Sequence, residues 1–125
     1  MNLSPDAIYR AWTQQIDAWF ATPETALMRP EINEPFFFLV SHEDQQHPHY
    51  GRFLKLEKNK LIELTWLTTG TLGAETWVTV ALTPQESRTH VLLTHAGFPN
   101  EESMLQHKEA WPKVLEQLER RISKL

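Results

Sequence analysis

Histidine is the residue type in this sequence best suited to chemistry near neutral pH, and His95 is the first candidate. It ends a stretch of alternating apolar residues, just before Ala96, Gly97 and Phe98. An imidazole at this point would be a polar group inside an apolar cavity, able to orient a ligand or to exchange a proton with it. A histidine that hydrogen-bonds to the backbone at this turn is the competing interpretation. No carboxylate stands at a spacing that favours the catalytic alternative.

Three further histidines raise the question of a metal site. His42, His47 and His49 lie close in sequence to Glu43 and Asp44. Imidazole and carboxylate groups are ligands of zinc and iron. The spacing is not that of two histidines on one helical face, and the segment has the composition of a polar loop. We therefore expect a solvated loop here and no metal site.

Aromatic side chains are abundant, with five Trp, six Phe and two Tyr among 125 residues. Each ring can remove about 150–250 Å² of surface from water, either by filling a core or by lining a pocket. Core packing is the competing interpretation for every candidate. Tyr50 or Arg52 would be available, with His95, for a polar group of a ligand. The candidates for contact with an apolar ligand are Phe38, Phe53, Trp66, His95, Met104, Trp111 and Leu115.

The composition argues against several functional classes. With 16 acidic and 12 basic residues the net charge is -4, which offers no electropositive surface to nucleic acid. The absence of cysteine excludes disulfides, thiolate catalysis and iron-sulfur clusters. The longest apolar run has five residues, Phe36–Val40, too short for a membrane span or a secretory signal. We expect a cytoplasmic protein that binds neither nucleic acid nor membranes and needs no cofactor.

A helix is expected from about Pro5, with Ser4 as its cap, until Thr22 and Pro23 end the apolar pattern. Proline suits the first helical position because its missing N–H has no helical partner there. The apolar residues that recur at helical spacing, and so predict one continuous stripe, are Ile8, Ala11, Trp12, Ile16, Trp19 and Phe20.

A second helical region is expected after Asn100, which can cap it. Proline lacks an N–H and clashes with the preceding turn, so Pro112 predicts a short helix ending near Ala110 and a longer one after it. The apolar stripe of this region comprises Met104, Trp111, Leu115, Leu118, Ile122 and Leu125.

Between Glu34 and His95 the apolar period changes to two, which predicts four or five consecutive antiparallel strands. A polar loop, His42–Pro48, would separate the first two. The expected strands are Pro35–Ser41, His49–Leu56, Leu61–Leu67, Ala74–Leu82 and Thr89–His95. Alternation places one set of side chains on the covered face: Ile62, Leu64, Trp66, Val78, Val80, Leu82, Val91, Leu93 and His95. The opposite, mostly solvated set is Glu63, Thr65, Trp77, Thr79, His90 and Thr94.

Several strings of this sequence together resemble one known family. They are Ser4–Thr13 followed by Trp19–Phe20, and, in the C-terminal half, Thr76–Pro84, Thr89–Pro99 and His107–Leu115. They are similar to the heat-shock protein 90 ATPase activator homologue family, which is part of the START and Bet v 1 (SRPBCC) superfamily. The resemblance covers nearly the whole chain. Its motifs are structural, and none is a catalytic signature.

The resemblance implies an α+β helix-grip fold for residues 1–125, taken as a single domain. In that fold a curved antiparallel sheet, here of five or six strands, wraps a long C-terminal helix and leaves a hydrophobic cavity between them. Family members usually carry a first strand of about ten residues before the first helix, whereas only Met1–Leu3 precede Ser4 here. Its absence predicts an exposed sheet edge and a homodimer through that edge.

Three functions are consistent with this resemblance. The preferred hypothesis is a protein that binds a hydrophobic or amphipathic small molecule in the cavity, without a cofactor and without catalysis. A co-chaperone that stimulates the heat-shock protein 90 ATPase is the second hypothesis. A polyketide cyclase or aromatase that uses the same cavity is the third, and it rests on fold-level analogy alone.

Overall fold

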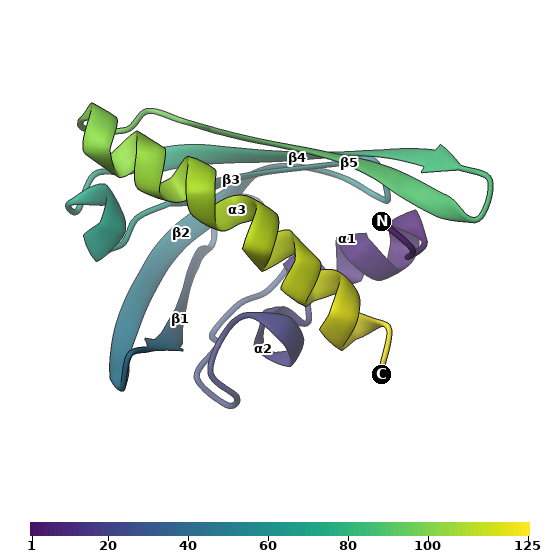
Figure 1. Ribbon diagram of the computed structural model, residues 1–125, viewed down its shortest axis with the longest axis horizontal. Helices are drawn as coiled ribbons and strands as arrows, with labels where there is room; N and C mark the ends of the chain where they lie inside the picture. The colour runs from purple at the N-terminus through teal and green to yellow at the C-terminus, as the bar shows by residue number, and fades with distance from the viewer.

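Five antiparallel strands form a meander in the order β1-β2-β3-β4-β5, each paired with its neighbours along the chain. The computed structural model describes residues 1–125. The long helix α3 crosses one face of the curved sheet, and α1 and α2 lie beside the C-terminal half of α3 (Figure 1). This arrangement confirms the predicted α+β helix-grip fold.

The strands are β1 (Pro35–His42), β2 (Gln45–Glu57), β3 (Leu61–Trp66), β4 (Thr76–Gln85) and β5 (Arg88–Ala96). The helical elements are α1 (Pro5–Thr13), α2 (Ile16–Trp19), a single turn η1 (Thr69–Thr71) and α3 (Glu101–Ile122).

The first hairpin is longer than the sequence predicts, because all residues of the expected polar loop His42–Pro48 except Glu43 and Asp44 are strand. A two-residue turn, Glu43 and Asp44, joins β1 to β2, and both residues have positive φ, 51° and 61°. Two successive positive φ values give the turn whose twist matches antiparallel strands. Pro48 pairs with Leu39 of β1 within the strand. The second strand is predicted from His49, and its first four residues, Gln45–Pro48, are missed because they are polar or proline and do not alternate with hydrophobic residues.

Both predicted helix caps are present. The Ser4 hydroxyl oxygen accepts a hydrogen bond from the Ala7 N–H at 3.1 Å, and the Asn100 side-chain oxygen accepts one from the Ser103 N–H at 2.8 Å. These oxygens satisfy N–H groups that have no partner inside the helix. The caps fix where α1 and α3 begin. No helix of the structure has the length and hydrophobicity needed to cross a membrane.

The apolar stripe that predicts one N-terminal helix is divided between α1 and α2, so that prediction is wrong. The Thr13 hydroxyl donates to the Tyr9 carbonyl oxygen at 2.8 Å, a local bond that competes with helix continuation. The break brings the rings of Trp12 and Trp19 to 5.1 Å between centroids, whereas residues seven apart in a straight helix are about 10 Å apart. The Trp19 indole N–H donates to the Ala11 carbonyl oxygen at 2.8 Å. Packing of the two indoles therefore outweighs helix continuity.

The helix α3 continues through Pro112, so the predicted break near Ala110 is also wrong. Proline inside a helix costs about 3 kcal/mol, because it removes one hydrogen bond and crowds the preceding turn. Pro112 is exposed, but Trp111 on one side and Leu118 and Ile122 on the other are buried against the rest of the protein. Because both halves of the helix are anchored to the same core, tertiary packing offsets the local cost.

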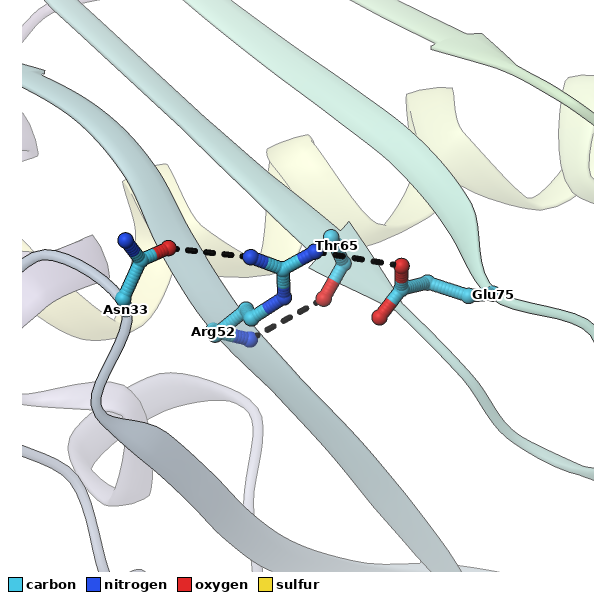
Figure 2. Close-up of polar contacts among 4 residues, drawn as sticks. All are labelled: Asn33, Arg52, Thr65 and Glu75. Atoms are coloured by element: carbon cyan, nitrogen blue, oxygen red, sulfur yellow. Dashed lines mark hydrogen bonds and ion pairs between the residues drawn. The ribbon is translucent and has the colours of Figure 1, made fainter.

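The face of the sheet that points away from α3 is partly covered, which corrects the prediction that Thr65 is solvated. Figure 2 shows Arg52 on this face, donating to the Asn33 side-chain oxygen at 2.9 Å and pairing with Glu75 at 3.4 Å. The Thr65 hydroxyl is buried and accepts the backbone N–H of Arg52 at 3.0 Å. Tyr50 has the strand parity of Arg52 and is exposed. Neither side chain is available to a ligand between the sheet and α3.

Aromatic rings fill the centre between the sheet and α3. The Trp111 ring lies 5.3 Å from that of Trp66 and 6.1 Å from that of Trp12, and Phe38 lies 5.9 Å from Trp66, between centroids. Such tilted and edge-to-face pairs add to the free energy gained by burial. The inward residues of β3 and β4 are buried below them, as alternation predicts: Ile62, Leu64, Trp66, Val78, Val80 and Leu82. The free space consequently lies along the two sides of α3.

Candidate functional site

An apolar groove of about 470 Å³ lies between β5 and the N-terminal half of α3. Seven of its ten lining residues are hydrophobic. Apart from Leu92, the strand contributes every second side chain, and the helix contributes one stripe, because these are the periods at which strands and helices repeat a face. The lining residues are Val91, Leu92, Leu93, His95, Phe98, Met104, Lys108, Trp111, Pro112 and Leu115. The size and the lining are those of a site for a small organic molecule.

The structure brings together four of the seven residues that the sequence singled out as ligand contacts: His95, Met104, Trp111 and Leu115 line the groove. The other three, Phe38, Phe53 and Trp66, are nearly fully buried in the core and lie on β1, β2 and β3, away from the strand that lines the groove. They are large buried rings, as expected, and of the three only Trp66 packs against a ring of α3, that of Trp111. Their place is that of packing residues.

The His95 ring is held by two side chains. The Thr76 hydroxyl donates to the Trp66 carbonyl oxygen at 2.5 Å, so it accepts the N–H of His95 Nε2, at 2.7 Å. The indole N–H of Trp111 donates to His95 Nδ1 at 3.0 Å. This network assigns the neutral tautomer with the proton on Nε2. Both nitrogens are occupied, so His95 presents only the face and edge of its ring to the groove.

The pKa of His95 is lowered to about 3, mainly because burial penalises the charged ring and secondarily because His107 is close. The two ring centroids are 4.9 Å apart. A neutral imidazole with both nitrogens engaged does not exchange protons with a ligand near pH 7. The ring therefore positions Trp111 at the floor of the groove, and the predicted backbone hydrogen bond of His95 is replaced by bonds to side chains.

The outer edge of β5 borders this groove, and it is paired at one residue. Met1 exchanges two backbone hydrogen bonds with Thr89, each 2.9 Å long. Because the direction of backbone groups alternates along a strand, every second residue after Thr89 has its N–H and C=O on the same edge. No strand or loop of the structure pairs with these outward groups. The residues concerned are Val91, Leu93 and His95.

The opposite side of α3 carries two clefts of a different character. One, of about 600 Å³, is larger than the groove but more polar, and Lys113 and Arg121 line it. The other, of about 360 Å³, is lined by four histidines: His42, His47, His49 and His107. No group of three or more histidine, aspartate or glutamate side chains is arranged to hold a metal ion. We favour the smaller apolar groove as the candidate site because hydrophobic lining, more than volume, stabilises an organic ligand.

Sequence reasoning missed four of the groove residues, Leu92, Phe98, Lys108 and Pro112. Val91 and Leu93 were assigned to the covered face of the sheet, but not to a ligand site. The signal that could have found Lys108 is helical spacing, since it lies four residues after Met104 and three before Trp111. Nothing in the periodicity indicates Phe98, because it lies in the connection between β5 and α3.

A family model described as Activator of Hsp90 ATPase homolog 1-like protein matches residues 2–123. A solved protein from Mesorhizobium loti has 23% identity and a TM-score of 0.77, covering 99% of this chain and 92% of its own. CalU16 from Micromonospora echinospora has 21% identity and a TM-score of 0.71, covering 98% and 71%. DynU16, from the dynemicin biosynthetic locus, has 17% identity and a TM-score of 0.75, covering 98% and 44%. These likenesses show the shared fold, and no curated protein matches the sequence.

Proposed function

This chain belongs to the Activator of Hsp90 ATPase homolog 1-like family, and from that premise we propose that it binds a hydrophobic or amphipathic small molecule between β5 and α3. The observation that carries the proposal is the groove of about 470 Å³ with its hydrophobic lining. Its volume falls within the range of about 300–1,000 Å³ common for ligand pockets. A ligand there would remove the exposed apolar side chains of β5 and α3 from water.

Binding without catalysis is the form of the proposal that the chemistry supports. A cyclase or aromatase would require a group in the groove that exchanges protons near neutral pH. The imidazole of His95 is neutral and both of its nitrogens are engaged by Thr76 and Trp111. The remaining titratable side chain that lines the groove is Lys108, which is exposed.

The proposal is tested by filling the groove with a side chain. Leu115 lines the groove and Val114 lines the polar cleft on the other side of α3, and both are half-buried. We expect Leu115→Trp to abolish binding of a probe such as 1-naphthol, followed by amide chemical shifts, and Val114→Trp to preserve it. Shifts that are absent from β5 and α3, or equal in both variants, would overturn the proposal.

Stimulation of the Hsp90 ATPase is the second candidate function, and the description of the matching family favours it. The test is a steady-state ATPase assay of purified Hsp90 with and without this chain. Stimulation that survives Leu115→Trp would show a surface separate from the groove. An unchanged ATPase rate at saturating chain would remove this candidate and leave ligand binding in place.

A further inference from the structure

We propose that the ligand of the groove is an amphipathic acid, with an apolar body and a carboxylate head group. This inference rests on the proposed function and names the class of ligand for the same site. It follows from two features: the single charged side chain in the lining, and the row of unpaired backbone groups along β5.

Lys108 supplies the charge. It is the one charged side chain among the ten that line the groove, and it takes part in no ion pair. Its neighbours one helical turn away, Met104 and Pro112, are uncharged and line the same groove. An unpaired ammonium beside an apolar surface attracts a carboxylate and repels an amine.

The edge of β5 supplies hydrogen-bond donors. Val91, Leu93 and His95 line the groove and have outward N–H groups without a partner in the protein. Backbone N–H groups donate strongly to carboxylate oxygens, because a charged acceptor shortens and strengthens the bond. The C=O groups on the same edge would bond to water.

No neutral side chain competes for this role. The nitrogens of His95 are engaged by Thr76 and Trp111, and the indole N–H of Trp111 is used in that same network. A polar head group in the groove therefore meets Lys108 and the β5 backbone. That environment favours a head group that is negatively charged and accepts hydrogen bonds.

The experiment compares three probes with the same chain: decanoate, decanol and decylamine. Decanoate and decylamine are titrated below their critical micelle concentrations, and decanol below its solubility limit, into the 15N-labelled protein at pH 7.5. Dissociation constants are taken from amide shifts. We expect decanoate to bind about three- to tenfold more tightly than decanol, and decylamine to bind more weakly than decanol. The amide protons of Val91 or Leu93 should shift downfield with decanoate.

Two variants and one matched control assign the effect to Lys108. Lys108→Gln should reduce the preference for decanoate over decanol to what the β5 N–H groups contribute, and Lys108→Glu should reverse the order so that decylamine binds more tightly than decanoate. Lys113→Gln removes the same charge from the same helix on the side of the polar cleft, and it should leave the decanoate preference unchanged. Because Lys108 and Lys113 are exposed, these variants should fold normally.

The outcomes separate this inference from the function on which it rests. If the three probes bind the groove with equal affinity, the acid class is wrong and ligand binding stands. If Lys108→Gln leaves the preference intact, the assignment of the attracting charge to Lys108 is wrong. If no probe shifts residues of β5 or α3, both proposals fail. A preference that is reduced both in 0.5 M NaCl and in Lys108→Gln would support the charge-based argument.

Discussion

The two outer edges of the sheet differ in how many of their backbone groups are hydrogen-bonded within the protein. The edge of β1 is covered: Leu27 exchanges two hydrogen bonds with Phe37, of 2.7 and 3.0 Å, and the Thr22 N–H donates to the Leu39 carbonyl oxygen at 2.8 Å. The edge of β5 is covered at Thr89 alone and is open beyond it. An exposed edge invites pairing with another chain, so its partners must be accounted for.

This difference between the edges extends to the two sides of α3. Beside the covered edge lie the two polar clefts described above. Beside the edge of β5 lies the apolar groove, with a further polar cleft next to it where Met1 pairs with Thr89. The same helix serves both sides, because Val114 and Leu115 are adjacent in sequence but point to different clefts. The proposed ligand groove therefore lies beside the open edge of the sheet.

Trp111 separates the groove from the aromatic centre, and Trp111→Ala should have the largest effect. Only 8% of the Trp111 surface is exposed. Loss of the ring opens a cavity and leaves His95 Nδ1 without the hydrogen bond that the Trp111 indole N–H donates. We expect a loss of about 3–5 kcal/mol in the free energy of unfolding, measured by urea denaturation. Trp77→Ala is the control, because Trp77 lies on the other face with 44% exposure. Equal losses in the two variants would contradict the central role of Trp111.

Acid should lower the free energy of unfolding, since a buried neutral histidine lies on each side of α3. Burial is the main cause that lowers the pKa of His49 to about 4 and that of His95 to about 3, and unfolding returns both to about 6.5. Below pH 6.5 the unfolded chain binds more protons, so stability is complete above that pH and falls as the pH drops towards 4. The loss from His49 should reach about 3 kcal/mol, and that from the partly exposed His95 should be smaller than its shift implies.

The measurement is urea denaturation at pH 7.5, 6.5, 5.5 and 4.5 for the wild-type chain and His49→Phe. Phenylalanine keeps the stacking of this position on Phe38, whose ring lies 5.1 Å away, and removes the titrating group. The variant should lose less stability between pH 6.5 and 4.5 than the wild type. Parallel stability curves for the two proteins would show that His49 does not titrate as proposed.

Hydrogen exchange should distinguish the two edges directly. The amides of Phe37 and Leu39 donate within the protein, to Leu27 and to the Thr25 hydroxyl, whereas those of Val91 and Leu93 face the open edge. We expect exchange at least about a hundredfold faster at the open edge. The homodimer that the sequence suggested would cover this edge, so protection that increases with protein concentration would indicate a second copy there.

The sequence predicts the features that local interactions determine, and it does not predict those that depend on tertiary packing. The caps at Ser4 and Asn100 and the inward face of β3 and β4 were predictable, because local hydrogen bonding and alternation determine them. The break after Thr13 and the continuity of α3 through Pro112 were not, since both depend on tertiary packing that overrides local preference. For the site, spacing brought His95 and Trp111 into one region, but the hydrogen bond between them depends on distances that a pattern does not contain.

The smallest effect should come from opening the covered edge with Thr25→Val. The Thr25 hydroxyl accepts the Leu39 N–H at 3.2 Å and donates to the Thr22 carbonyl oxygen at 2.7 Å. Valine has the same shape without the hydroxyl, so the free energy of unfolding should fall by about 1 kcal/mol. Thr94→Val, on the exposed face of β5, is the matched control and should be close to neutral. Because the Leu39 amide loses its acceptor, its exchange should approach that of Val91, and an unchanged Leu39 rate would mean that the backbone alone protects the β1 edge.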